Sequence, residues 1–229
     1  MTIPFRAFDE RGEIRIYYHG VLPHWRQTGC MYFVTYRQAD ALPSAVIREF
    51  EYERNEWLSH RGIDASLLKN GECKWKDTVG KLSATDQRNY EKVMAKKLNK
   101  YLDAGHGSCV LKRPDIRKVV ADSLEFFHEQ RVWTGDYVVM PNHVHVLMRP
   151  MPEFDLEDIL QAVKSYTATR INQLLGTEGR FWMRESYDHI VRDFEQLEAF
   201  QIYIAGNPKK ANLRSDEYTL RQVNYHPDE

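Results

Sequence analysis

The chain has 229 residues, 42% hydrophobic and 28% charged, which is an ordinary globular composition with enough length for one large domain and its core. No stretch approaches the ~20 apolar residues of a membrane span, and the N-terminus lacks the apolar core of a signal peptide, so we expect a cytoplasmic protein without a membrane partner. A net charge of −1 gives no general attraction for nucleic acid, so a local basic patch would have to supply it. Three widely spaced cysteines form no C-x-x-C pair, which argues against a zinc knuckle or a disulfide framework.

The first 105 residues predict one strand of a main sheet followed by an insertion. Residues 1–28 have little periodicity beyond a short edge strand at 13–18. The aromatic and β-branched stretch CMYFVTYR at 30–37 is typical of a core strand. A helix is then predicted from Ser44 to Ser59, a loop-like stretch at 63–83, and a second helix from Thr85 or Asp86 to just before Gly105. We expect residues 42–105 to form a helical insertion.

The second inserted helix carries lysines at i, i+4 and i+8 spacing, among them Lys96, Lys97 and Lys100. A solvated surface helix explains this face without any function. Continued by Lys112 and Arg113, the same face becomes a surface that contacts DNA phosphates, which supply most sequence-independent affinity for nucleic acid. Both interpretations remain open.

The rest of the chain predicts helix 114–130, strands 132–140 and 143–149, helix 156–175, strand 187–191 and a helix 194–205 that ends at Gly206-Asn207-Pro208. Pro141-Asn142 between the two central strands indicates an antiparallel hairpin or a bulge. The order β-α-β-β-α-β is that of a ferredoxin-like α+β fold, an antiparallel sheet with helices on one face. We expect one domain over residues 1–229 with a peripheral tail at 214–229.

The stretch VVMPNHVHVLMR at 138–149 is the most informative part of the chain. Residues i and i+2 of a strand share one face, so His143 and His145 point at the same place and can share a metal ion. An isolated H-x-H is more often the polar face of a half-buried strand, and its neighbours decide between the two interpretations.

Four blocks in order, VVMPNHVHVLMRP, LQAVKSYTATRINQLLG, GRFWMRESYDHIVRD and YIAGNPKKANL, resemble the REP-associated tyrosine transposases, a branch of the single-strand HUH transposases. The resemblance runs from about Gly29 to Leu213. It implies the same ferredoxin-like fold and a metal-dependent enzyme that nicks and transfers single-stranded DNA beside a hairpin, with Mg²⁺ or Mn²⁺. The product would be a 5′-phosphotyrosine with a free 3′-hydroxyl.

The resemblance suggests His143 and His145 as metal ligands and a tyrosine as nucleophile. We expect Tyr166, at the margin of the apolar stripe of helix 156–175, to meet the histidines when that helix packs across the sheet. Tyr187 is the alternative nucleophile. Related transposases place a polar metal ligand one turn after the tyrosine, where this chain has Arg170. A guanidinium does not bind a cation, so Gln173 or Asn172 are the remaining candidates for the third ligand.

The predicted partner is single-stranded DNA with a REP-like hairpin, bound by a monomer or a homodimer that is nucleoid-associated when on DNA. The cations predicted to contact it are Lys96, Lys97, Lys100, Lys112, Arg113, Lys164, Arg170, Arg184, Lys209 and Lys210. A second hypothesis is a non-catalytic regulator that binds hairpin nucleic acid. A third, a ferredoxin-like RNA-binding module, ranks last because the chain lacks the aromatic-rich strand motif typical of such modules.

Overall fold

The computed structural model describes residues 2–19, 22–64 and 79–228. Its strands are β1 Thr2–Phe5, β2 Arg15–His19, β3 Leu22–Arg26, β4 Tyr32–Arg37, β5 Val132–Val139, β6 His143–Pro150, β7 Tyr187–Ile190, β8 Thr219–Arg221 and β9 Asn224–Pro227. Its helices are α1 Ser44–Ser59, α3 Ala84–Asp103, α4 Pro114–Phe126, α5 Leu156–Leu175 and α6 Phe194–Lys210, with short 3₁₀ turns at Val79–Lys81 and Val110–Lys112.

The centre of the molecule is a five-stranded antiparallel sheet in the order β7-β4-β6-β5-β8. Its first four strands have the ferredoxin-like arrangement, because the third strand of the β-α-β-β-α-β series lies between the first and the second. The predicted α+β fold is therefore confirmed. β5 and β6 form the predicted hairpin, closed by a bond from Met140 N to His143 O of 2.9 Å, and the bulge lies instead between Thr134 and Tyr137.

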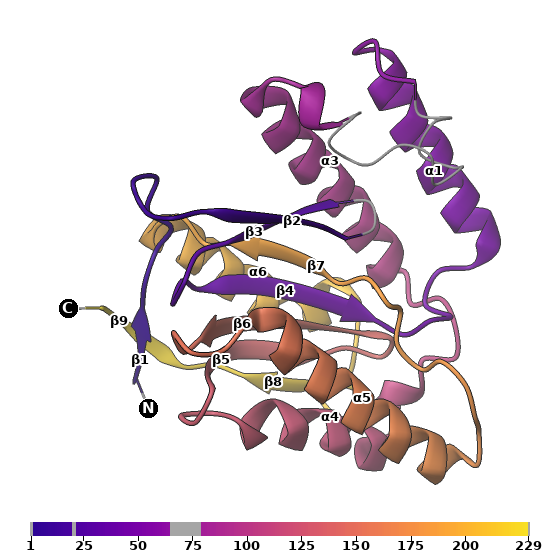
Figure 1. Cartoon of the computed structure of the whole chain (residues 1–229). Coiled ribbons are helices and arrows are strands. Elements are labelled where there is room, and N and C mark those ends of the chain that lie inside the picture. The colour runs from indigo at the N-terminus through magenta and orange to yellow at the C-terminus, as the bar shows by residue number, and fades with distance from the viewer. Residues whose placement is uncertain (1, 20–21, 65–78, 229) are drawn as a thin grey trace.

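Helices cover both faces of this sheet, which corrects the prediction that they lie on one face (Figure 1). The crossover helices α4 and α5 pack on one face, as predicted, and Val144, Val146 and Met148 of β6 belong to the core between them. The opposite face carries Leu147 of β6 and is covered by α6, with the N- and C-terminal segments beside it. Because side chains alternate along a strand, His143 and His145 lie on the α6 face with Leu147.

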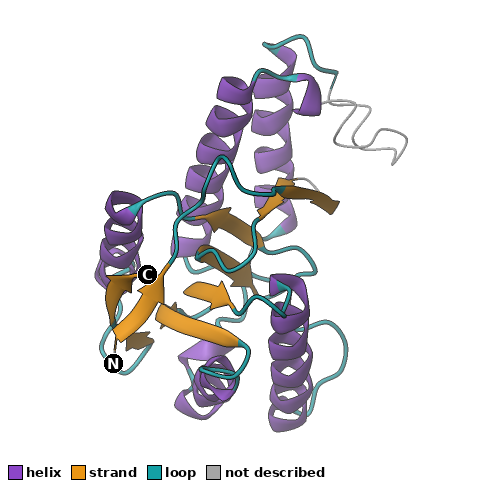
Figure 2. Cartoon of the chain, turned by 60° about the vertical axis from the view of Figure 1, so that its left-hand side comes forward, coloured by secondary structure: helices purple, strands orange, loops and turns teal. Residues whose placement is uncertain are grey.

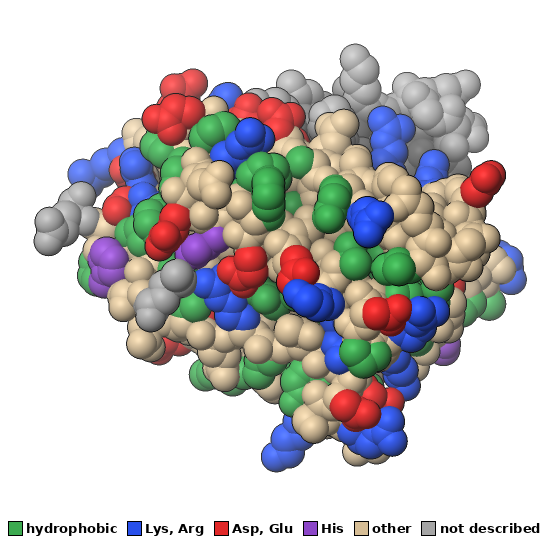
Figure 3. All heavy atoms as spheres, turned by 90° about the horizontal axis from the view of Figure 1, so that it is seen from below, with side chains coloured by type: hydrophobic (Ala, Val, Ile, Leu, Met, Phe, Trp, Pro, Cys, Tyr) green, Lys and Arg blue, Asp and Glu red, His purple; other side chains and the backbone are tan. Residues whose placement is uncertain are grey.

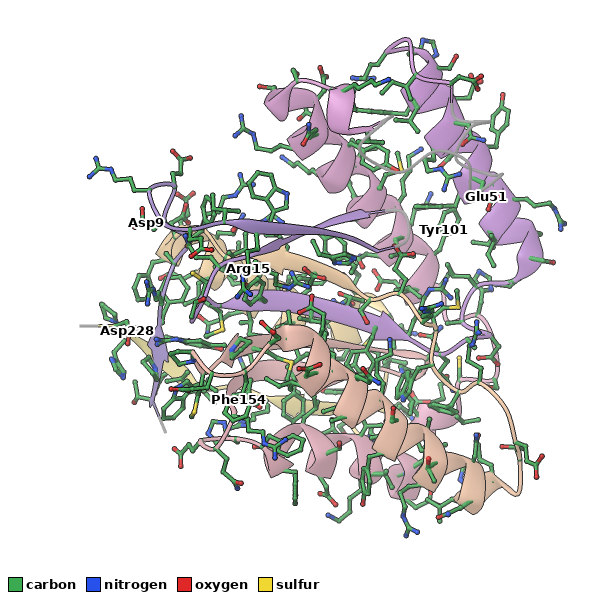
Figure 4. The ribbon with its side chains drawn as sticks, in the orientation of Figure 1. Asp9, Arg15, Glu51, Tyr101, Phe154 and Asp228 are labelled. Carbon is green, nitrogen blue, oxygen red and sulfur yellow. The ribbon has the colours of Figure 1, made fainter. Side chains whose placement is uncertain are left out.

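The insertion forms a pair of helices, α1 and α3, that projects from the sheet in both views (Figures 1 and 2). It has a small core of its own, with Leu58, Tyr90 and Met94 buried between the two helices. A second cluster around Leu102 joins its base to the sheet domain, and Tyr101 in this cluster lies on the side of α3 that faces α1 (Figure 4). Residues 65–78 of the predicted loop-like stretch lie outside the described residues.

The tail is not peripheral, which corrects the prediction for residues 214–229. β8 extends the sheet beside β5, and β9 pairs in parallel with β1, so the two ends of the chain lie side by side (Figure 2). Arg149 of β6 joins them, because its guanidinium donates to Pro4 O at 2.9 Å and pairs with Asp228. Local sequence patterns missed these strands because they are short edge strands that pair with segments far away in the sequence.

The hairpin β2–β3 is fixed to the sheet by a buried ionic cluster around Asp188 of β7. Its carboxylate binds both His24 and Arg26, and Arg26 Nε also donates to Glu157 at 2.8 Å. Burial raises the pKa of Asp188, but the hydrogen bond from His24 and the charge of Arg26 outweigh burial and hold this pKa below its usual value. The cluster thus favours the charged carboxylate.

The surface below the sheet mixes charges of both signs. Figure 3, seen from that side, shows Lys and Arg side chains scattered among acidic and hydrophobic ones. Within the part of the chain that the structure describes, no helix has both the length and the apolarity that crossing a membrane requires.

Replacing Asp188 by Asn should lower the free energy of unfolding at pH 7 by about 3 kcal/mol, because the buried Arg26 charge loses its main partner. A carboxylate whose folded pKa is depressed stabilises the fold above its unfolded pKa of about 3.9, and this contribution is lost as pH falls through the folded pKa. The difference between wild type and variant in urea denaturation should therefore shrink below about pH 4.

Asp122→Asn serves as the control, because the Lys118–Asp122 pair is 72% and 60% exposed and such pairs contribute little. If the Asp188→Asn protein were as stable as this control at pH 7, the ionic cluster would not stabilise the fold as proposed.

Candidate active site

The two histidines of β6 form the centre of the candidate site. Their Nε2 atoms lie 3.0 Å apart and both side chains are almost completely buried. His143 Nδ1 donates to Asn142 Oδ1 at 2.7 Å, and the amide of Asn142 in turn donates to His106 O at 2.8 Å. Since the amide oxygen is an acceptor, the proton of His143 is on Nδ1, and Nε2 presents its lone pair.

His145 is held by the neighbouring strand β4. Its Nδ1 lies 2.7 Å from the Thr35 hydroxyl, directly opposite in the strand register. Its ring stacks on Phe33, with centroids 5.5 Å apart, and Phe33 stacks in turn on Phe200 of α6 at 4.3 Å. Burial lowers the pKa of both histidines, that of His143 to about 3, so both rings are neutral near pH 7. A neutral imidazole is the form that binds a metal ion.

Asp103, the last residue of α3, completes a group that is able to hold a cation. Ligand atoms of Asp103, His143 and His145 all lie within 4.8 Å of one another. One carboxylate oxygen of Asp103 pairs with Lys210, and the buried Oδ1 has no hydrogen-bond partner among the described residues. Two imidazoles and a carboxylate fit a divalent metal, because oxygen ligands suit Mg²⁺ and Mn²⁺ and imidazole suits many divalent ions.

Tyr203 of α6 brings a phenol to this group. Its hydroxyl lies 3.4 Å from His145 Nε2, and the two rings meet edge to face with centroids 5.1 Å apart. Burial raises the pKa of Tyr203 above its usual value, while a hydrogen bond from the Asn207 side chain lowers it. Asn207 is itself almost fully buried, and its Oδ1 has no partner among the described residues.

α6 does not end at Gly206-Asn207-Pro208, as the sequence predicts, but continues to Lys210. Pro208 lies in the last turn, where its missing N–H removes one helical hydrogen bond without ending the helix, and it is buried together with Asn207. The helix therefore places Asn207 one turn after Tyr203, on the same side.

The predicted meeting of Tyr166 with the histidines is wrong. Tyr166 is 56% exposed on α5, and the buried residues of α5 belong to the core on the other face of the sheet. Asn172 and Gln173 also lie on α5, where Asn172 donates to Gly179 O at 2.9 Å and Gln173 accepts from Arg170 at 2.8 Å. Side chains alternate along β6, so its face toward α5 is opposite to the face that carries the two histidines. All three residues of α5 are therefore separated from the histidine pair by the sheet.

Tyr187, the alternative nucleophile, is on the α6 side of the sheet, at the edge strand β7. It lines a cleft together with Tyr203.

The cations predicted to contact DNA divide into two groups. Lys96, Lys100, Arg184 and Lys209 are exposed. The others have partners within the chain: Lys97 with Glu53 at 2.6 Å, Lys112 with Glu217 at 3.3 Å, Arg113 with Asp115 at 2.6 Å, Lys164 with Arg184 O at 2.9 Å, Arg170 with Gln173 and Lys210 with Asp103.

Sequence reasoning missed Asp103, Tyr203 and Asn207 as site residues. Tyr203 and Asn207 lie in the block YIAGNPKKANL, and their spacing of four residues was the available signal, hidden by the interpretation of Gly206-Asn207-Pro208 as a helix end. Asp103 gave no signal, because it lies 40 residues before the histidine strand and reaches it only through the packing of α3.

One protein family matches part of the chain. Residues 113–207 match the family described as "Transposase IS200 like", a segment that begins before α4 and ends at Asn207. No curated protein matches the chain.

Among solved structures, a similar one is described as the REP-associated tyrosine transposase bound to a REP hairpin. It is 12% identical, with a TM-score of 0.41 over 87% of this chain and 73% of that one. The kinship with single-strand transposases that the motif blocks led us to expect is confirmed over residues 113–207, which match the IS200-like transposase family.

Proposed function

We propose that the protein is a metal-dependent enzyme that nicks and rejoins single-stranded DNA through a phosphotyrosine formed on Tyr203. The observation that carries the proposal is the Tyr203 hydroxyl 3.4 Å from His145 Nε2, at the group formed by the buried His143 and His145 and the half-buried Asp103. Tyr166 plays no part in this proposal, because it lies on the other face of the sheet.

His143, His145 and Asp103 would hold the cation, with the buried Oδ1 of Asn207 as a further oxygen near the phenol. A divalent ion here would polarise a P–O bond of the scissile phosphate and neutralise developing charge. Asn142 and Thr35 orient the two imidazoles so that their Nε2 atoms face the same point.

In the proposed reaction the phenol oxygen of Tyr203 attacks phosphorus, loses its proton and forms a phosphodiester with the protein. The DNA 3′-oxygen leaves and takes up a proton, which gives the 5′-phosphotyrosine and free 3′-hydroxyl that the motif resemblance implies. A phenolate also leaves readily, so the step reverses and can join a different 3′-hydroxyl. The raised pKa of Tyr203 favours the protonated phenol, and the hydrogen bond from Asn207 opposes this by stabilising the phenolate.

The proposed substrate is single-stranded DNA that flanks a hairpin. The exposed Lys100 and Lys209 belong to the two helices that carry Asp103 and Tyr203, so they offer phosphate contacts close to the candidate site.

The first experiment incubates the protein with labelled hairpin DNA and Mn²⁺ and looks for a covalent protein–DNA band on a denaturing gel. Tyr203→Phe should abolish the band, because phenylalanine has no oxygen to attack phosphorus, while DNA binding stays within about twofold. Tyr166→Phe and Tyr187→Phe are the matched controls and should keep it.

A band that survives Tyr203→Phe and disappears with either control would overturn the assignment. Specific hairpin binding with no band from the wild type would favour the non-catalytic regulator.

Metal binding can be measured without DNA or activity, by the electron paramagnetic resonance signal of free Mn²⁺. Both His143→Ala and Asp103→Asn should weaken Mn²⁺ binding at least about tenfold, since each removes a charged or lone-pair donor from the group. Asp216→Asn, an exposed carboxylate change elsewhere on the surface, should leave the affinity unchanged. Wild-type affinity in Asp103→Asn would exclude Asp103 as a ligand.

A further inference from the structure

A cleft of about 370 Å³ lies directly beside the candidate nucleophile. Its walls come from α3 of the insertion, from β7 and from α6, and Tyr203 is part of its lining. A ligand in this cleft would therefore contact the same tyrosine that we propose attacks DNA. The family match over residues 113–207 does not include α3, so one wall of the cleft lies outside the matched segment.

Aromatic side chains form one side of the cleft. Phe200 and Tyr187 line it together with Tyr203. Phe200 is held in place by its stack on Phe33, with the rings 4.3 Å apart and inclined by only 5°. Fixed aromatic rings are the surfaces on which unpaired bases stack, at ~1–3 kcal/mol per base.

The cleft also gathers buried polar atoms that have no hydrogen-bond partner among the described residues. These atoms are Asn99 Oδ1 on α3, His189 Nε2 on β7 and Arg192 Nε just after β7. Burial and the nearby Arg192 lower the pKa of His189 to about 4, so its ring is neutral near pH 7. An unpartnered buried polar atom costs ~1–3 kcal/mol, so three around one cleft point to a ligand that supplies the missing partners.

The chemistry of these atoms fits the edge of a base. Asn99 Oδ1 accepts a hydrogen bond and Arg192 Nε donates one, and the edge of every DNA base presents both donors and acceptors. Arg88 and Lys92, one turn apart on α3, add two exposed cations to the lining, which suits a flanking phosphate.

The size of the cleft limits the occupant. Its volume is near the lower end of the ~300–1,000 Å³ of ordinary small-ligand sites. This size suits one nucleotide better than a base pair.

We propose that this cleft binds one unpaired nucleotide of the DNA strand next to the phosphate that Tyr203 attacks. The base lies against Phe200 and Tyr187 and bonds to Asn99 and Arg192, while Arg88 and Lys92 contact the backbone. This inference rests on the proposed function, and it gives the inserted helix α3 the task of positioning the strand at the tyrosine.

The test measures binding alone, by fluorescence anisotropy, with the Tyr203→Phe protein so that no cleavage occurs. The strands carry a single abasic site at each position within three nucleotides of the cleavage point. One abasic position should weaken binding about tenfold, the loss expected when one stacked base is removed. Equal affinity for the intact strand and every abasic strand would overturn the proposal.

The Asn99→Ala variant tests whether the loss of binding at the sensitive abasic site arises in this cleft. Added to Tyr203→Phe, it should weaken binding of the intact strand several-fold and reduce the further effect of the sensitive abasic site, because the two changes remove the same contact. If the losses of binding free energy from Asn99→Ala and from the sensitive abasic site add in full, the base does not contact Asn99 and lies outside this cleft. Circular dichroism melting checks that the variant is folded, and Phe200→Leu, which removes the stacking surface, provides an independent second variant.

A pair of charge reversals on α3 separates a cleft contact from general attraction. Lys92 lines the cleft, while Lys96 is an exposed lysine one turn further along that does not. Lys92→Glu should weaken binding of the single strand severalfold more than Lys96→Glu. Equal losses would show only long-range attraction and would overturn the proposed contact. The gel assay tests whether Tyr203 attacks DNA, whereas the anisotropy assay tests whether the cleft binds a nucleotide. A missing covalent band would therefore contradict the proposed chemistry without changing the result of the binding measurement.

Discussion

The alternation of side chains along β6 is the constraint on which the rest of the structure depends. Val144, Val146 and Met148 fill the core beneath α4 and α5, so the residues between them must point to the α6 face. Two imidazoles are thereby buried at one place, at a cost that is offset only when their second nitrogens have partners. Asn142 and Thr35 supply those partners, and in doing so they aim both Nε2 atoms at a common point.

The neighbouring helices α6 and α3 determine which other side chains lie close to the two Nε2 atoms. α6 crosses the histidine face and brings a phenol and, one turn later, a buried amide, because the helix continues through Pro208. α3 brings the carboxylate of Asp103, whose ion pair with Lys210 ties the end of the insertion to the end of α6. The candidate site is thus assembled from three elements that are far apart in the sequence and meet only after folding.

The sequence predicts whatever depends on local pattern. The bounds of α5, the hairpin of β5 and β6 and the shared face of the two histidines follow from periodicity, caps and turn residues. It does not predict which helix lies on which face of the sheet, because both faces of β6 carry residues suited to burial. Tyr166 was therefore placed on the wrong side, although its own helix was predicted correctly. The pairing of β1 with β9 is equally invisible to local pattern.

The insertion is the part of the molecule for which local pattern offered two explanations, a solvated helix or a DNA surface. Its position favours a third role. One end of α3 supplies a carboxylate at the histidines, and the adjacent turns supply the half-buried Asn99 and the exposed Lys92 beside Tyr203. α3 packs on α1 through a small core, and it meets the sheet domain through the cluster around Leu102 and through the pair with Lys210. Any displacement of α3 would then change the cation site and the proposed nucleotide cleft together, because one rigid helix carries residues of both.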